Sequence, residues 1–450
     1  MNLNVDLPEL LAPAGSMERL EAAVLYGTDA VYLGGCDELN LRQGALGFNW
    51  QELDRAIALT RARGVKLYYC INAFPRQTGF ARVEESLERL AELAVDGLIV
   101  ADPGVFRLAR KLAPGHPIHV STQANTASGE AALFWHEQGA ARVNLARELD
   151  AQELRAALAF MREHAPGLES EVFVHGAMCL AVSGQCLLSA WLNQRPGNLG
   201  QCTHPCRFEY RAVEYDDAGG LAALTPAQGA GLKLEEALRQ GAPLWEIGPA
   251  EGMAEAGFSA FMSPYDLCLA SYLVWFARQG VSALKIEGRM RTAPMIAQTV
   301  NVYRTALDDL AAGRFRPALY LRELGPLSSR ALSSGFFLPG GKRKLFSSPR
   351  TEAGASPVVA RLEAELSPGV WQVAVKARWE RSATAEVLLP GLKTVPLAAG
   401  SYAFENHRAE QAQVLHPGTA ATFYLPEGLS AEASLAELRP GLFVRAAADG

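Results

Sequence analysis

Four of the seven cysteines are grouped in a way that indicates metal or cluster binding. Cys179, Cys186, Cys202 and Cys206 are separated by six, fifteen and three residues. Thiolates are the ligands of Zn²⁺ and of iron–sulfur clusters. Structural zinc sites usually use two short cysteine pairs, and only the second pair is short here. The spacing therefore favours an iron–sulfur cluster over zinc; buried cysteines without a ligand are the third interpretation.

The other three cysteines are expected to be structural. Cys36 and Cys70 lie in or just after strand-like runs, and Cys268 lies at a predicted helix start, where it either packs in the core or replaces one of the four ligands. The odd count argues against a disulfide framework, and the N-terminus lacks the pattern of an export signal. No apolar run approaches the roughly 20 residues that span a bilayer. We therefore expect a cytoplasmic protein with no membrane contact.

A second group of polar residues lies at the ends of strand-like runs. His175 ends EVFVH, and Lys285, Glu287 and Arg289 lie along ALKIEGR. Lys285 and Glu287 share one face of a strand, and Arg289 has the geometry to bind a carboxylate through two hydrogen bonds. These four residues are candidate catalytic groups around a small organic acid. The alternatives are a salt bridge in the core and, for His175, a hydrogen-bonded core histidine.

Four further residues are candidates for substrate contacts. Asn72 follows YYCI, Gln123 and Asn125 follow HVS, and Arg207 follows the last grouped cysteine. Polar residues at the carboxyl ends of barrel strands are where such folds place their chemistry. The sequence therefore marks these four side chains as candidates for binding substrate.

The elements that must position these residues alternate between strands and helices. Helix starts are indicated by Asn49, by Asp102 with Pro103, and by Asp150 with Glu153 as a capping box. The pattern predicts a (β/α)8 barrel, and an open doubly wound sheet is the structural alternative. The eight strand-like runs begin at Glu9, Ala30, Val65, Gly97, Pro117, Arg142, Glu171 and Ala283.

The chain is expected to contain two domains joined by an arm. Residues 1–313 form the barrel, with a cysteine-rich insertion at 176–282 after the seventh strand; 314–356 are rich in Ser, Pro, Gly and Arg and read as an arm. From 357 to 450 the apolar period changes to two, which predicts a small β-barrel-like domain. A net charge of −6 excludes a generally basic polynucleotide-coating protein but leaves room for a local basic groove.

Several segments resemble the collagenase-like peptidases, peptidase family U32. They are ELLAPAGSMERLEAAVLYGTDAVYLGG, STQAN, HGAMCLAVSGQCLLS, NLGQCTHPCRFEY, SALKIEGRMRT and VYRTALDDLAAG. The resemblance covers about residues 1–345 and, more loosely, the tail. SPYDLC and LRQGALGF depart from the family pattern and leave the substrate open.

The resemblance implies a [4Fe-4S] cluster on the four grouped cysteines and a hydroxylation reaction. Three activities are known in the family: prephenate-dependent 5-hydroxylation of a tRNA wobble uridine, hydroxylation of a cytidine in ribosomal RNA, and hydroxylation of a ubiquinone precursor. A barrel with one β-rich tail favours the tRNA branch, with tRNA and prephenate as partners. Peptidase activity is the remaining alternative, although the chain has neither HExxH nor GxSxG and four cysteines exceed the need for one nucleophile.

Overall fold

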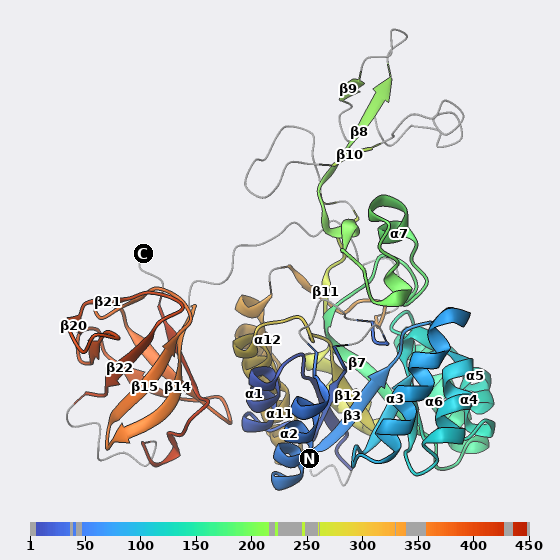
Figure 1. Ribbon diagram of the computed structural model, residues 1–450, viewed down its shortest axis with the longest axis horizontal. Coiled ribbons are helices and arrows are strands. Elements are labelled where there is room, and N and C mark those ends of the chain that lie inside the picture. The colour runs from blue at the N-terminus through green and yellow to red at the C-terminus, as the bar shows by residue number, and fades with distance from the viewer. Residues whose placement is uncertain are drawn as a thin grey trace.

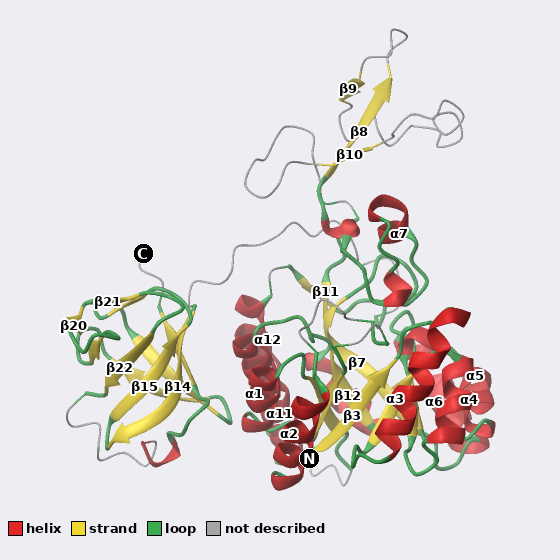
Figure 2. Cartoon of the chain, viewed as in Figure 1, coloured by secondary structure: helices red, strands yellow, loops and turns green. Residues whose placement is uncertain are grey.

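The protein consists of a barrel surrounded by helices and a separate body made of strands (Figures 1 and 2). No helix among the residues described is long and apolar enough to cross a membrane. The computed structural model describes residues 6–36, 39–41, 47–215, 221–223, 245–247, 260, 262–328, 330–338, 357–426 and 435–447.

Eight parallel strands form the barrel, as the sequence predicts. Each strand pairs with the next along the chain, and the last strand pairs with both the seventh and the first, so that Ala283 lies beside Glu9. This closure excludes the open doubly wound sheet. The strands are β1 (Glu9–Pro13), β2 (Ala30–Leu33), β3 (Lys66–Ile71), β4 (Gly97–Val100), β5 (Ile118–Val120), β6 (Arg142–Asn144), β7 (Glu169–Ala177) and β12 (Ala283–Ile286).

Helices cover the outside of the barrel and begin at the residues that the sequence indicates. Asn49 and Asp150 each form a capping box, and the Asp102 side chain accepts a hydrogen bond from Val105 N. These caps satisfy backbone donors that would otherwise lack partners. The helices are α1 (Met17–Leu25), α2 (Trp50–Ala62), α3 (Phe80–Ala91), α4 (Pro103–Leu112), α5 (Gly129–Glu137), α6 (Ala151–His164), α10 (Leu273–Arg278) and α11 (Ala293–Ala311).

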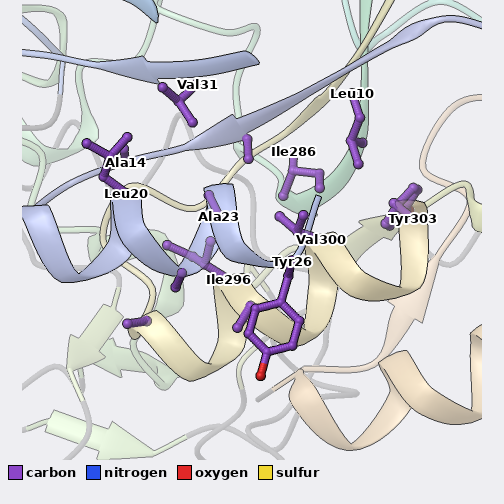
Figure 3. Close-up of a cluster of buried hydrophobic side chains, with 14 of the residues drawn as sticks. Leu10, Ala14, Leu20, Ala23, Tyr26, Val31, Ile286, Ile296, Val300 and Tyr303 are labelled. Atoms are coloured by element: carbon purple, nitrogen blue, oxygen red, sulfur yellow. The ribbon is translucent and has the colours of Figure 1, made fainter. Parts of the chain in front are cut away.

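The apolar core lies between the barrel wall and these helices. Figure 3 shows Leu20 and Ala23 of α1 packed toward Ile296 and Val300 of α11, and all four side chains are buried. Tyr26, at the end of α1, is also buried. Burying such side chains is the main source of stability, and it fixes the barrel as a rigid support for the ends of its strands.

The insertion after β7 carries the four grouped cysteines. It contains α7 (Leu188–Asn193) and a small antiparallel sheet of β8 (Tyr210–Tyr215), β9 (Leu221–Ala223) and β10 (Trp245–Ile247). The chain then returns as β11 (Asp266–Cys268), antiparallel to β7. Cys268 therefore lies in a strand rather than at a helix start.

The arm is partly structured. Helix α12 (Pro317–Leu324) and the short strand β13 (Leu332–Ser333), which pairs with β11, fall inside the stretch 314–356 that composition marks as an arm. Tyr320 of α12 is fully buried. Apolar residues in a polar, Pro-rich stretch thus find a place on the barrel that composition alone does not reveal.

The C-terminal region is all-β, as predicted. Its main sheet has the order β18-β17-β23-β14-β15-β22-β19-β20, every pairing is antiparallel, and a two-stranded sheet lies beside it. The two ends of this order, β18 and β20, do not pair with each other among the described residues, so the hydrogen bonding is that of an open sheet. The strands are β14 (Val358–Ser367), β15 (Val370–Val375), β16 (Trp379–Glu380), β17 (Ala385–Leu389), β18 (Lys393–Leu397), β19 (Ala403–Glu405), β20 (Gln411–Ala412), β21 (Val414–Leu415), β22 (Ala420–Tyr424) and β23 (Phe443–Ala446).

Hydrogen bonds join this region to the barrel helices. The Tyr26 hydroxyl donates to Leu388 O at 2.9 Å, and Asn301 Nδ2 of α11 donates to Leu389 O at 2.9 Å. Asn301 Oδ1 accepts in return from Gly391 N at 2.8 Å. The contact lies on the outer side of α1 and α11, so it supports the barrel without touching its mouth.

Candidate active site at the barrel mouth

The four grouped cysteines lie in the segment that leaves the barrel at the end where the strands stop. Cys179 follows β7 by two residues, and all four thiols are half-buried. Burial raises the pKa of the Cys206 thiol to about 11, and the neighbouring Cys179, Cys202 and Cys186 raise it further while Arg207 opposes them.

The surroundings of the thiols suit a thiolate-held cluster. His204 N points to Cys202 Sγ at 3.4 Å, and Gly197, which has no side chain, leaves space beside the same sulfur. In the part of the chain that is described, no group of three His, Cys, Asp or Glu side chains is arranged to hold a metal ion.

Arg147 connects the cysteine segment to the barrel, although it is not among the residues predicted from the sequence. Its guanidinium donates to Ala177 O at 2.8 Å, to Ser183 Oγ at 2.5 Å and to Cys179 Sγ at 3.6 Å. It also lies over the Phe173 ring at 5.1 Å. Arg147 closely follows β6, so the rule that selected Asn72 and Gln123 would have found it.

A small polar cavity opens at the same end of the barrel. It measures about 40 Å³ and lies among the side chains that follow β2, β3, β5 and β12. Three of the four predicted catalytic residues, Lys285, Glu287 and Arg289, line it. The complete lining consists of Tyr32, Leu41, Cys70, Asn72, Ile99, Ser121, Thr122, Gln123, Phe173, Lys285, Glu287 and Arg289.

Arg289 is held in this cavity by two glycines and one amide. Its side chain is buried, and Nη1 donates to Asn40 Oδ1 at 3.0 Å. A Cβ atom at Gly15 would lie 2.0 Å from Arg289 O, and one at Gly34 would lie 2.8 Å from Nη1. The glycines in LAPAGS and LGG are therefore needed for the backbone and the guanidinium of Arg289 to reach their positions.

Glu287 joins the cavity to the start of the cysteine segment. Its backbone N donates to His175 O at 2.8 Å, and its Oε2 accepts from Ala177 N at 3.3 Å. Gly176 has a φ of +108°, and a Cβ there would lie 2.6 Å from Glu287 O. The carboxylate is thus held by the backbone that leads to Cys179.

Lys285 belongs to a buried ion network. Its Nζ lies 2.7 Å from Glu171 and 4.4 Å from the centre of the Tyr32 ring. Glu171 also accepts from Asn144 Nδ2 at 2.6 Å and lies 3.5 Å from Arg142. Although burial opposes it, Lys285 and Arg142 hold the pKa of the Glu171 carboxyl below its usual value. This geometry matches the alternative interpretation of a salt bridge in the core.

His175 does not line the cavity that contains Arg289. It lies opposite Cys268 on β11, and Tyr303 OH is 3.4 Å from its Nδ1. It lines a second small cavity that Asp266, Arg291 and Glu287 share. Burial lowers the pKa of His175 to about 4, so the ring is neutral at pH 7.

The four predicted substrate-contact residues divide into two groups. Asn72 and Gln123 line the cavity, where Asn72 Oδ1 accepts from Leu41 N at 3.2 Å. Asn125 instead ends a helical turn with a φ of 52°, a conformation that asparagine tolerates. Arg207 lies beside Cys206 and influences its pKa. The structure therefore does not bring all four together.

The cysteine segment and the cavity are in direct contact. A Cβ at Gly184 would lie 2.4 Å from Gln123 Oε1, so Gly184 packs directly on this amide. Gln123 Oε1 is buried and has no hydrogen-bond partner among the described residues. On the opposite side, Phe74 N donates to Asn198 O at 3.1 Å. These contacts place the cysteine segment over the mouth of the barrel.

The remaining thiols do not resemble a protease nucleophile. Burial raises the pKa of both Cys70 and Cys268, whereas a reactive cysteine needs a lowered pKa. Cys268 packs in the core, 4.0 Å from Tyr303 OH. Cys36 is exposed rather than packed, contrary to its expected structural role.

Residues 15–345 match the sequence profile of Peptidase family U32. Among similar proteins, tRNA hydroxylation protein P of Escherichia coli is 36% identical over 73% of this chain and 74% of its own length. tRNA hydroxylation protein P1 of Bacillus subtilis is 35% identical over 75% of this chain and 73% of its own length. A protein named collagenase from Porphyromonas gingivalis is 28% identical over 75% of both chains. The chain belongs to peptidase family U32.

Proposed function

We propose that this chain hydroxylates tRNA, forming 5-hydroxyuridine at the wobble position with prephenate as co-substrate. In this proposal Cys179, Cys186, Cys202 and Cys206 hold a [4Fe-4S] cluster, which when bound supplies one-electron redox chemistry. The observation that carries the proposal is the packing of the cysteine segment on a polar cavity at the end of a barrel where enzymes of this fold act. Relatives named as tRNA hydroxylation proteins over most of the chain support the choice of RNA.

The cavity offers groups of the right charge for an organic acid. Arg289 presents a buried guanidinium, which binds carboxylates more tightly than an exposed one because water is excluded. Glu287 and Gln123 supply acceptors on its rim. At about 40 Å³ the cavity is smaller than ligand sites of about 300 Å³ or more, so binding a co-substrate requires the rim to move. The predicted function of Arg289 is therefore to bind and orient the acid.

Lys285 and His175 have supporting functions in this proposal. Lys285 keeps Glu171 ionised beneath the cavity and adds positive charge to its floor. His175 is neutral and holds the strand from which the cysteine segment leaves. Neither residue is required to contact the reacting atoms.

The test has two independent measurements. Protein purified without oxygen is analysed for iron, sulfide and absorption near 400 nm, beside the Cys202→Ala and Cys206→Ala variants. We expect bound iron in the parent protein and its loss in both variants. One equivalent of zinc without iron would contradict the cluster.

The second measurement is made on RNA. A bacterium that lacks its own tRNA hydroxylation protein receives the gene, and its tRNA nucleosides are analysed by mass spectrometry with and without a supply of prephenate. We expect 5-hydroxyuridine to appear with the parent gene and to be absent with Arg289→Gln. A new hydroxylated cytidine in ribosomal RNA, or restored ubiquinone synthesis, would instead identify the other activities of the family. Gelatin hydrolysis that survives all four cysteine substitutions would favour a peptidase.

A further inference from the structure

Exposed apolar side chains gather on the cysteine segment. Ten large hydrophobic residues are exposed among those described, and four of them lie between 182 and 208. Leu187 and Trp191 are the most exposed, at 78% and 76%, and Phe208 is 39% exposed. Scattered exposed residues need no explanation, but a local concentration beside a candidate site marks a contact surface.

Trp191 is held in a defined position. Its N donates to Leu187 O at 2.8 Å, so the two side chains lie one helical turn apart on the same face. Helix α7 is tied to the loop between the last two cysteines, because Ser189 Oγ accepts from Thr203 N at 3.1 Å and Asn193 Nδ2 donates to Thr203 Oγ1 at 2.6 Å. This helix lies at the outer end of the cysteine segment, away from the outer barrel helices (Figure 1).

The charge of this surface differs from that of the whole chain. Residues 178–208 contain two arginines and no Asp or Glu, although acidic residues outnumber basic ones by 48 to 42 overall. Arg195 is exposed next to α7, and Arg207 precedes Phe208. Glu209 is the first carboxylate after this stretch. Outside this stretch, Glu148 contacts Ser183 at its start, away from α7 in the sequence. Exposed apolar and aromatic side chains beside an arginine are complementary to an unpaired nucleobase and its phosphate.

We propose that Trp191, with Leu187 beside it and Arg195 nearby, is a stacking surface for an unpaired base of the RNA substrate. The inference rests on the proposed function and names the residues that would hold the RNA next to the thiols. A tryptophan face accepts any base, so the surface supplies affinity and position, while the barrel cavity selects the nucleotide that reacts. A paired duplex has no free base to offer and would not use it.

The test compares affinities for two probes by fluorescence anisotropy. The probes are a single-stranded uridine oligonucleotide and a fully paired RNA duplex of the same length. Trp191→Ala is expected to weaken single-strand binding about five- to hundredfold and to leave duplex binding unchanged, because stacking on one aromatic ring contributes about that much. Trp191→Phe should retain most of the affinity.

Two further variants complete the test, one as a control and one as a probe of the phosphate contact. Phe134→Ala removes another exposed aromatic side chain, on α5 and away from the cysteines, and is expected to have no effect. Arg195→Gln should reduce the slope of log affinity against log salt by about 0.7, the value for one single-strand phosphate contact, whereas Trp191→Ala should not. Iron content and thermal unfolding of each variant are measured alongside.

Three results would overturn the inference. They are unchanged single-strand affinity in Trp191→Ala, an equal loss for the duplex, or an equal loss in Phe134→Ala. Each result would indicate that this surface binds a protein partner instead of RNA. None of them bears on the nucleoside measurement: the proposed function fails only if 5-hydroxyuridine does not depend on the gene, whatever Trp191 contributes.

Discussion

The two ends of the barrel differ in whether their buried polar atoms have hydrogen-bond or ion-pair partners. Where the strands begin, the Arg142 side chain is only 3% exposed and lies 2.7 Å from Glu9 and 3.5 Å from Glu171. Where the strands stop, Gln123 Oε1 and Arg147 Nε are buried without a hydrogen-bond partner among the described residues. Arg207 Nε and Glu148 Oε2, on the same side, share this condition.

This difference indicates that the end where the strands begin serves stability and the end where they stop serves function. An unpaired buried polar atom costs about 1–3 kcal/mol, so a protein keeps several of them together only where something else supplies the partner. The contrast is one of degree. His119 Nδ1 and Asn144 Oδ1 near the paired end also have no partner among the residues that the structure describes, and at the other end the buried Asp266 pairs with Arg291 at 2.5 Å. We expect substitutions at the first end to change stability and substitutions at the second end to change cofactor and substrate binding.

The largest expected effect is at the paired end. Glu171→Ala removes the carboxylate between Lys285 and Arg142 and should lower the free energy of unfolding by about 3–5 kcal/mol, because it leaves buried positive charge without its partner. Urea unfolding measures the change. The exposed Glu163→Ala on α6 serves as control and should stay within about 0.5 kcal/mol. A loss below 1 kcal/mol for Glu171→Ala would contradict the conclusion that the paired charges at this end stabilise the fold.

At the unpaired end, Arg147→Gln should affect the cofactor rather than the fold. The substitution removes the charged donor to Cys179 Sγ, and loss of a group that orients a metal ligand typically weakens metal affinity about ten- to hundredfold. Competition with an iron chelator measures this loss. The exposed Arg155→Gln is the matched control. Equal iron retention in both variants would mean that Arg147 only supports the backbone.

Burial of His175 makes the stability of the protein depend on pH. The pKa of His175 is lowered to about 4 by burial, whereas an unfolded histidine titrates near 6.5. The unfolded chain therefore binds the extra proton between these values, so the stability that neutral His175 contributes is complete above pH 6.5 and is lost as the pH falls toward 4. We expect a loss of about 2 kcal/mol between pH 7 and pH 5.

His175→Gln should remove this part of the pH dependence, and the exposed His407→Gln should not. Unfolding free energies at the two pH values provide the measurement. Glu171 does not obscure the result. A carboxyl whose pKa is lowered by folding loses its stabilising contribution only as the pH falls below the unfolded value of about 4.3. If the difference in unfolding free energy between pH 7 and pH 5 is the same in His175→Gln as in the parent protein, the ring is accessible to protons in the folded protein.

The smallest effect is expected from a cysteine that lies outside the group of four. Cys268→Ala removes a buried side chain next to Tyr303 and should cost about 1 kcal/mol without loss of iron. Cys202→Ala should instead lose iron without this loss of stability. Loss of iron in Cys268→Ala would show that Cys268 contributes to the cofactor site and would weaken the division between the two ends.

Much of the fold is readable from local patterns. Apolar runs, helix caps such as Asn49 and Asp150, and the change to a period of two near residue 357 depend on neighbours in the chain, so the sequence alone determined the barrel, its helix starts and the β-rich tail. The grouping of the cysteines was equally visible, because four of them lie within 28 residues. Helix α12 was not visible in the sequence, because its burial depends on a surface built from distant segments.

Tertiary structure decided which polar residues meet. Lys285 and Glu287 both line the cavity, yet strand pairing sets Lys285 against Glu171 and Glu287 against the backbone of Ala177. His175 is turned toward Tyr303 and away from Arg289, and Arg147 reaches Cys179 across 32 positions. Such outcomes depend on strand register and on contacts between residues far apart in the chain. The sequence by itself determined the elements and the kinds of chemistry, and only the closed barrel decided which side chains share a site.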